Sequence, residues 1–71
     1  MTTRERKEHR ATVADVRNVF GEVLARSRYG GEMTVVMNRS AEAAAIVPME
    51  FYRRALEALG ETVVPAEPPT T

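Results

Sequence analysis

Apolar side chains recur at steps of three and four residues from residue 13 onward, a spacing that predicts an amphipathic helix with one buried stripe. Thr12 or Asp15 can cap its start, because their side-chain oxygens accept hydrogen bonds from the unpaired N–H groups of a first turn. Gly21 costs about 1 kcal/mol relative to alanine in a helix, so we expect a bend or a split into two shorter helices there. The Gly30-Gly31 pair ends the helix, since glycine readily adopts the left-handed conformation of a helix C-terminus. The apolar positions are Val13, Val16, Val19, Phe20, Val23 and Leu24.

A β-branched run at residues 33–38 predicts a strand, because glycines precede it and turn-forming residues follow it. The next segment, residues 41–47, has two interpretations. Its alanine content favours a helix. However, Pro48 favours extended backbone at the residue before it, and the segment is too short for a stable helix by itself. The alternative is a β-hairpin in which residues 33–38 pair with residues 42–47.

A second apolar stripe follows Pro48, a residue suited to open a helix, and it stops at Gly60. Its members are Phe51 or Tyr52, Ala55, Leu56 and Leu59. The chain therefore divides into a mobile basic arm at residues 1–10, a folded domain at residues 11–60 and a proline-rich, disordered tail at residues 61–71. We expect the core or a dimer interface to contain Val13, Val16, Phe20, Val23, Leu24, Val35, Leu56 and Leu59.

Length and composition limit the classes of protein to consider. A chain of 71 residues holds one small domain, and a core of this size usually needs disulfides, a metal or a partner subunit. The chain has no cysteine and a single histidine, His9, so we expect no disulfide, no metal site and no cofactor, and self-association becomes the expected source of stability. No apolar run approaches the ~20 residues that span a bilayer, and the N-terminus does not resemble a signal peptide. We therefore expect a cytoplasmic protein without a membrane partner.

The net charge is zero, but the charges are distributed unevenly. Residues 1–39 carry eight basic and five acidic side chains, whereas residues 40–71 carry two basic and five acidic ones. Nine of the ten basic residues are arginine, whose planar guanidinium suits phosphate and guanine. The first half thus favours a phosphate-rich partner, with solvated surface charge as the alternative interpretation.

Motifs for catalysis are missing from the sequence. Gly30-Gly31 is an isolated pair, without the further glycine or the Lys-Ser/Thr of a phosphate-binding loop. Ser27 and Ser40 have no histidine nearby in the sequence, and His9 lies in the arm, where we expect it to be exposed and inert. An enzyme is therefore the weakest class of function, and we expect none.

Four motifs together resemble the Phd/YefM family of antitoxins from bacterial toxin–antitoxin pairs. Residues 13–20 resemble the family's opening S-E-A-R-x-N-L pattern, and residues 29–32 resemble its x-G-G-E turn. Residues 34–48 match the length of its V-V-I-T-R-R-G-K-P-V-A-V-L-V-P hairpin, and residues 49–52 resemble its L-E-E-Y helix start. The resemblance covers residues 11 to about 59. The chain departs from the pattern at Asn38, at Ser40 and at residues 43–45, and its tail after Gly60 is shorter than is usual in the family.

The resemblance implies a small α+β domain with an N-terminal helix, a β-hairpin and a C-terminal helix, in which two chains form an intertwined homodimer. It also implies an autorepressor that binds palindromic operator DNA, and a C-terminal part that neutralises a cognate toxin. A two-fold dimer places two copies of the basic half on one face.

Candidate DNA-binding residues follow from the charge pattern and the resemblance. Arg17 lies near the N-terminal end of the first helix and matches the family's DNA-contacting arginine, with Asn18 beside it. Arg39 lies at the hairpin tip. The arm adds basic residues that can follow a DNA backbone or enter a minor groove, namely Arg4, Arg6, Lys7 and Arg10. For a toxin, the candidate contacts are Leu56, Leu59, Val63 and Val64.

Two other interpretations compete with this one. A ribbon-helix-helix repressor is also small, dimeric and basic at its N-terminus, but it requires residues 33–47 to be largely helical. A protein-binding adaptor that never contacts DNA would use the arginines for solubility. Salt-sensitive binding to a duplex distinguishes the adaptor from both kinds of repressor.

Overall fold

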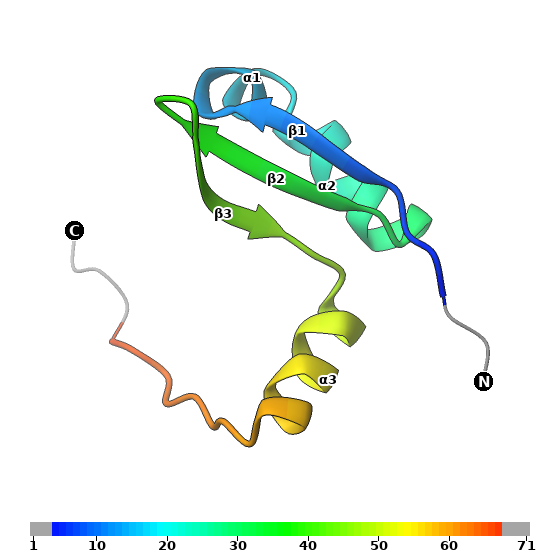
Figure 1. Ribbon diagram of the computed structural model, residues 1–71, viewed down its shortest axis with the longest axis vertical. Coiled ribbons are helices and arrows are strands. Elements are labelled where there is room, and N and C mark those ends of the chain that lie inside the picture. The colour runs from blue at the N-terminus through cyan, green and yellow to red at the C-terminus, as the bar shows by residue number, and fades with distance from the viewer. Residues whose placement is uncertain (1–3, 68–71) are drawn as a thin grey trace.

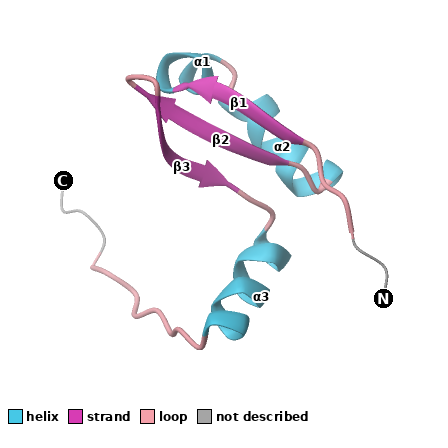
Figure 2. Ribbon diagram, in the orientation of Figure 1, coloured by secondary structure: helices cyan, strands magenta, loops and turns pink. Residues whose placement is uncertain are grey.

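A computed structural model describes residues 4–67 and shows an α+β fold, as the sequence predicts. The elements in chain order are β1 (Glu8–Thr12), α1 (Val13–Asn18), α2 (Phe20–Gly30), β2 (Met33–Asn38), β3 (Ala41–Ile46) and α3 (Met49–Leu59). Figures 1 and 2 show that α1 and α2 lie against one face of the sheet, whereas α3 projects away from it.

The sheet has the strand order β1-β2-β3. β1 and β2 are parallel and are joined by α1 and α2, while β2 and β3 form an antiparallel hairpin. α1 contacts β1 and β2, and α2 contacts β2 and β3, so the two short helices together cover the width of the sheet. The opposite face carries no helix of the described chain (Figure 1).

The prediction of a mobile arm is wrong for residues 8–10, which belong to strand β1. Glu8 is aligned with Met33 and Thr12 with Met37 in the parallel ladder, and the Met33 N–H donates to the Lys7 carbonyl. Backbone hydrogen bonds order this segment, and they need no apolar side chains. Side chains still alternate in exposure, with His9 and Ala11 half-buried and their neighbours exposed. Residues 1–3 lie outside the described residues.

The predicted first helix is split, but at Val19 rather than at Gly21. Thr12 caps α1 as expected, because its hydroxyl accepts the Asp15 N–H at 3.1 Å. Val19 leaves the helical conformation with φ −126° and ψ 35°, which lets α1 and α2 follow different directions over the sheet. Gly31 ends α2 in the left-handed conformation, with φ 68°, which confirms the predicted glycine stop.

Residues 41–46 form a strand, so the hairpin interpretation is confirmed and the helix alternative is wrong. Strands at residues 33–38 and 41–46 also exclude the ribbon-helix-helix arrangement, which needs helix there. The pairing shifts between Val36 and Met37, whose partners are Ala44 and Glu42, so Ala43 forms a bulge.

Helix α3 begins after Pro48 and ends at Gly60, which adopts φ 69°, as the sequence predicts. None of its residues is buried. Residues 61–67 are exposed and form neither helix nor strand, and residues 68–71 lie outside the described residues. No helix within residues 4–67 combines the length and apolarity needed to cross a membrane.

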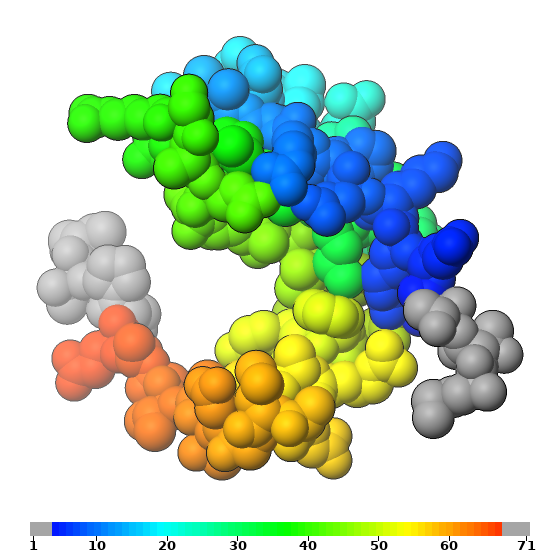
Figure 3. Space-filling view, viewed as in Figure 1, coloured from blue at the N-terminus to red at the C-terminus, as the bar shows by residue number. Residues whose placement is uncertain are grey.

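The core between the sheet and the helices is very small. The buried side chains among the described residues are the apolar Val16, Val23 and Pro48 and the polar Ser27 and Thr34. Four predicted core residues, Val13, Phe20, Leu24 and Leu59, are exposed in the single chain. The chain exposes 6202 Å², whereas a compact protein of its mass exposes about 4,400 Å². Figure 3 shows the same openness as a hollow between the sheet and α3. A single chain therefore leaves ten large hydrophobic side chains exposed within residues 4–67.

Candidate nucleic-acid interface

Two predicted DNA-binding elements meet at one end of the sheet. Thr12, the last residue of β1, is aligned with Met37 near the end of β2. Helix α1 begins directly after β1, and the β2–β3 turn follows β2, so both leave the sheet at the same end (Figure 1). Arg17 and Asn18 of α1 and Arg39 of the turn therefore belong to one end of the molecule.

Arg17 lies in the last turn of α1 rather than near the start of a long helix, because the helix ends at Asn18. The unpaired carbonyls at a helix C-terminus carry partial negative charge, which favours a cation at this position. Both Arg17 and Asn18 are exposed. Neither side chain forms a hydrogen bond or ion pair within residues 4–67, so the Arg17 guanidinium is available to a ligand.

Arg39 occupies a two-residue hairpin turn with an unfavourable backbone. Arg39 and Ser40 have φ values of 53° and 65°, both in the left-handed region. A two-residue hairpin loop with two positive φ angles fits the right-handed twist of its strands, but it usually contains glycine or asparagine. Arg39 is exposed and forms no ion pair with another described residue. The turn therefore holds an arginine side chain out at the hairpin tip at a cost in backbone energy.

The arginines that the sequence places in the arm are already engaged with acidic groups. Arg10 of β1 forms ion pairs with Glu8 and Glu42, and its Nη1 lies 3.6 Å from the Met37 sulfur. Arg4 and Arg6 both pair with Glu50. Lys7 is exposed and has no ion-pair partner among the described residues. The arm thus divides into one unpaired cation and three arginines bound to carboxylates.

His9 is part of a polar network that sequence reasoning missed. The expectation of an exposed, inert His9 is wrong, since its side chain is only 31% exposed and its Nε2 bonds Glu32 Oε1. Its other ring nitrogen, Nδ1, faces Arg26 Nη1 at 3.4 Å. The hydrogen bond from His9 holds the pKa of Glu32 below its ordinary value of 4.5. This network joins β1 to the end of α2, and the sequence of residues 8–12 carries no apolar pattern that could have revealed it.

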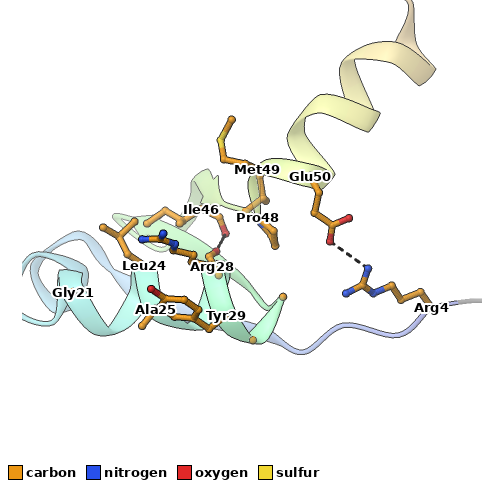
Figure 4. Close-up of a pocket in the computed structure, with 14 residues that line it drawn as sticks. Arg4, Gly21, Leu24, Ala25, Arg28, Tyr29, Ile46, Pro48, Met49 and Glu50 are labelled. Carbon is orange, nitrogen blue, oxygen red and sulfur yellow. Dashed lines mark hydrogen bonds and ion pairs between the residues drawn. The ribbon is translucent and has the colours of Figure 1, made fainter.

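An open, mainly apolar groove of about 760 Å³ lies between α2 and the segment that joins β3 to α3. Leu24, Ala25 and Tyr29 of α2 form one wall, and Ile46 and Met49 lie opposite (Figure 4). Leu24 is 46% exposed and Tyr29 is 77% exposed. No described segment of the same chain fills this groove.

The four predicted toxin contacts lie on α3 and just after it. Leu56 is half-buried, and Leu59 is 70% exposed on the same helix. Val63 and Val64 follow in the extended segment, where Val64 is 87% exposed. Three of the four, Leu59, Val63 and Val64, are therefore mostly exposed in the single chain.

The site therefore contains unpaired arginines at one end of the sheet and uncovered apolar surfaces on α2 and α3. The described residues bring together no group of three or more histidine, cysteine or acidic side chains that could hold a metal ion. Comparisons of this chain with protein-family models, with curated proteins and with solved structures find no match.

Proposed function

We propose that this protein is a dimeric DNA-binding repressor of the Phd/YefM antitoxin type, which binds an operator through the end of the sheet that carries Arg17 and Arg39. The observation that carries the proposal is that these two exposed arginines belong to the same end and have no acidic partner within residues 4–67. Phosphate and base edges are the partners that unpaired guanidinium groups suit best.

The proposed dimer accounts for the uncovered apolar surface. The chain exposes about 1,800 Å² more than a compact protein of its mass, and Val13, Phe20 and Leu24 contribute to the exposed surface. A stable protein interface buries at least about 1,000 Å² in total. A second copy covering the outer sides of α1 and α2 would bring these side chains into a common core.

Two-fold symmetry then sets the form of the operator. Each copy contributes one Arg17 and one Arg39, so the dimer presents this pair of arginines twice. Half-sites related by the same symmetry would match them, which makes a palindromic operator the expected target. Repression of its own promoter follows from the family resemblance.

The apolar side of α3 supports a second role in toxin neutralisation. Helix α3 is strongly amphipathic, yet it has no buried residue, and Leu59 and Val64 are highly exposed. An unpartnered amphipathic helix is a common way to dock into a groove of another protein. The same feature favours the adaptor interpretation, in which the chain binds a protein and no DNA.

Substitution of Arg17 by alanine tests DNA recognition. Loss of a base contact should weaken specific binding by about 1 to 3 kcal/mol and relax the preference at one position in each half-site. The matched control is Arg53→Ala, which removes an exposed arginine from α3, where its guanidinium lies over the Tyr52 ring. Binding can be measured by gel-shift titration against a panel of operator variants.

Equal affinity of Arg17→Ala and the parent chain would exclude Arg17 as a DNA contact. Absence of any salt-sensitive binding to duplex DNA by the parent chain would instead favour the adaptor. A chain that ends at Gly60 tests the toxin surface, because it lacks Val63 and Val64. If it still co-purifies with the product of the adjacent gene, the tail is not the toxin-binding segment.

A further inference from the structure

Arg6 joins three parts of the chain through one guanidinium group. Its Nη1 donates to the Gly31 carbonyl at 2.9 Å, and its Nη2 donates to Glu50 Oε1 at 3.1 Å. The same group lies over the Phe51 ring, 5.6 Å from its centroid. The Arg6 side chain is only 10% exposed, which is unusual for an arginine in a short polar segment. Arg6 therefore holds a fixed position between the α2–β2 turn and the first turn of α3.

Arg4 converges on the same acceptor atom. Its Nη1 lies 3.2 Å from Glu50 Oε1, the oxygen that Arg6 also contacts (Figure 4 shows the Arg4 contact). Two guanidinium groups thus surround a single carboxylate oxygen. The hydrogen bond from Arg6 holds the pKa of Glu50 below its ordinary value, so the carboxylate is charged at neutral pH. We refer to Arg4, Arg6 and Glu50 as the clasp.

Two converging guanidinium groups are also the arrangement that binds a phosphate oxygen. Glu50 is half exposed at the side chain, so solvent and solutes reach the clasp. The Arg4–Glu50 pair is exposed, and exposed ion pairs contribute little net stability, so a competing anion can replace the carboxylate at Arg4 at small cost. Helix α3 has no buried residue that would hold its first turn in place if Glu50 were released.

We propose that Glu50 occupies, in the free protein, the position that a DNA phosphate takes between Arg4 and Arg6. This inference rests on the proposed function and adds a second DNA contact to it, because Arg4 and Arg6 precede β1 and so lie at the opposite end of the sheet from Arg17 and Arg39. The clasp makes α3 an internal competitor of DNA for the two arginines. DNA binding through residues 4–6 then releases the first turn of α3, so the position of α3 depends on whether this pair of arginines is bound to DNA.

Substitution Glu50→Gln tests the competition, because it removes the charge and keeps the side-chain shape. The matched control is Glu57→Gln, which neutralises an exposed glutamate on the same helix that forms no ion pair within residues 4–67. Binding to a duplex of random sequence and to an operator duplex should tighten about two- to fivefold in Glu50→Gln relative to Glu57→Gln. The fall of affinity with increasing salt should also be steeper in Glu50→Gln, because in the parent chain added salt weakens the competing Glu50 ion pairs as well as the DNA contacts.

A second measurement follows the displacement directly. The side-chain carboxyl carbon of Glu50, observed by NMR during a pH titration, reports the pKa of this group in the free and DNA-bound chain. We expect the low pKa to return toward its ordinary value when a duplex is added, because Arg4 and Arg6 then contact phosphate. The Glu32 carboxyl, which bonds His9 in the same chain, serves as the internal reference and should keep its low pKa.

The outcomes distinguish this inference from the proposed function. If the parent and both variants bind the duplex with equal affinity and equal salt dependence, and the Glu50 pKa is unchanged by DNA, the clasp is structural only and the inference is overturned. If no variant binds DNA under any salt condition, the proposed function itself fails. Tighter binding restricted to Glu50→Gln supports both.

Discussion

A glycine substitution at Arg39 in the hairpin turn should change stability and DNA binding in opposite directions, raising the stability of the fold and weakening DNA binding. Arg39 and Ser40 have φ values of 53° and 65°. A residue other than glycine costs about 1 to 2 kcal/mol in the left-handed conformation. Replacement by glycine removes this cost, but it also raises the conformational entropy of the unfolded chain, which offsets about 0.5 to 1 kcal/mol of the stabilisation. Each of Arg39→Gly and Ser40→Gly should therefore stabilise the folded chain by roughly 0.5 to 1 kcal/mol.

The two variants should differ in DNA binding. Ser40→Gly should leave affinity for the operator unchanged, since the Arg39 side chain remains at the tip. Arg39→Gly should stabilise the chain equally and weaken DNA binding, because it removes an unpaired guanidinium. Thermal unfolding at equal chain concentration measures stability, with an increase of about 4 to 8 °C in Tm per kcal/mol for a domain of this size. Lower stability of Ser40→Gly would refute the turn geometry, and unchanged DNA affinity of Arg39→Gly would refute its role in binding.

Two further predictions concern the uncovered helix face and acid stability. Leu24→Glu should weaken dimerisation by about ten- to one-hundredfold in sedimentation experiments, because burial of a leucine contributes about 1.5 to 3 kcal/mol. The control Glu22→Gln on the same helix should leave dimerisation unchanged. A dimer unaffected by Leu24→Glu would exclude this face as the interface. Because His9 lowers the pKa of Glu32 in the folded chain, this pair stabilises the fold above the ordinary carboxyl pKa, and its contribution is lost as pH falls through the lowered value. Urea unfolding from neutral to acid pH should therefore show a smaller loss of stability in His9→Gln, and identical pH profiles would contradict the prediction.

Local signals in the sequence were sufficient to predict most of the elements. Thr12, Gly31 and Gly60 act at helix ends as their side chains or backbone freedom suggest. The two helix interpretations that failed, a break at Gly21 and a helix at residues 41–47, relied on intrinsic propensity alone. In both places the packing on the sheet and the strand pairing outweighed a preference of about 1 kcal/mol or less per residue.

Contacts between segments far apart in the chain could not be predicted from the sequence. Strand β1 forms because residues 8–12 pair with a strand 25 positions later, and its composition resembles a solvated arm. The same holds for the site, in which Arg6 and Glu50 are 44 residues apart. Counting charges identified the basic half of the chain, but only the fold separates the unpaired Arg17 and Arg39 from arginines already bound to carboxylates.

Sedimentation equilibrium with and without an operator duplex tests most directly whether two copies together form the DNA-binding surface. The chain weighs 7.9 kDa, so we predict a particle of about twice this mass in the absence of DNA and two chains on each palindromic duplex. A particle with the mass of one chain that does not sediment with the duplex at low salt would contradict both the dimer and the DNA-binding function.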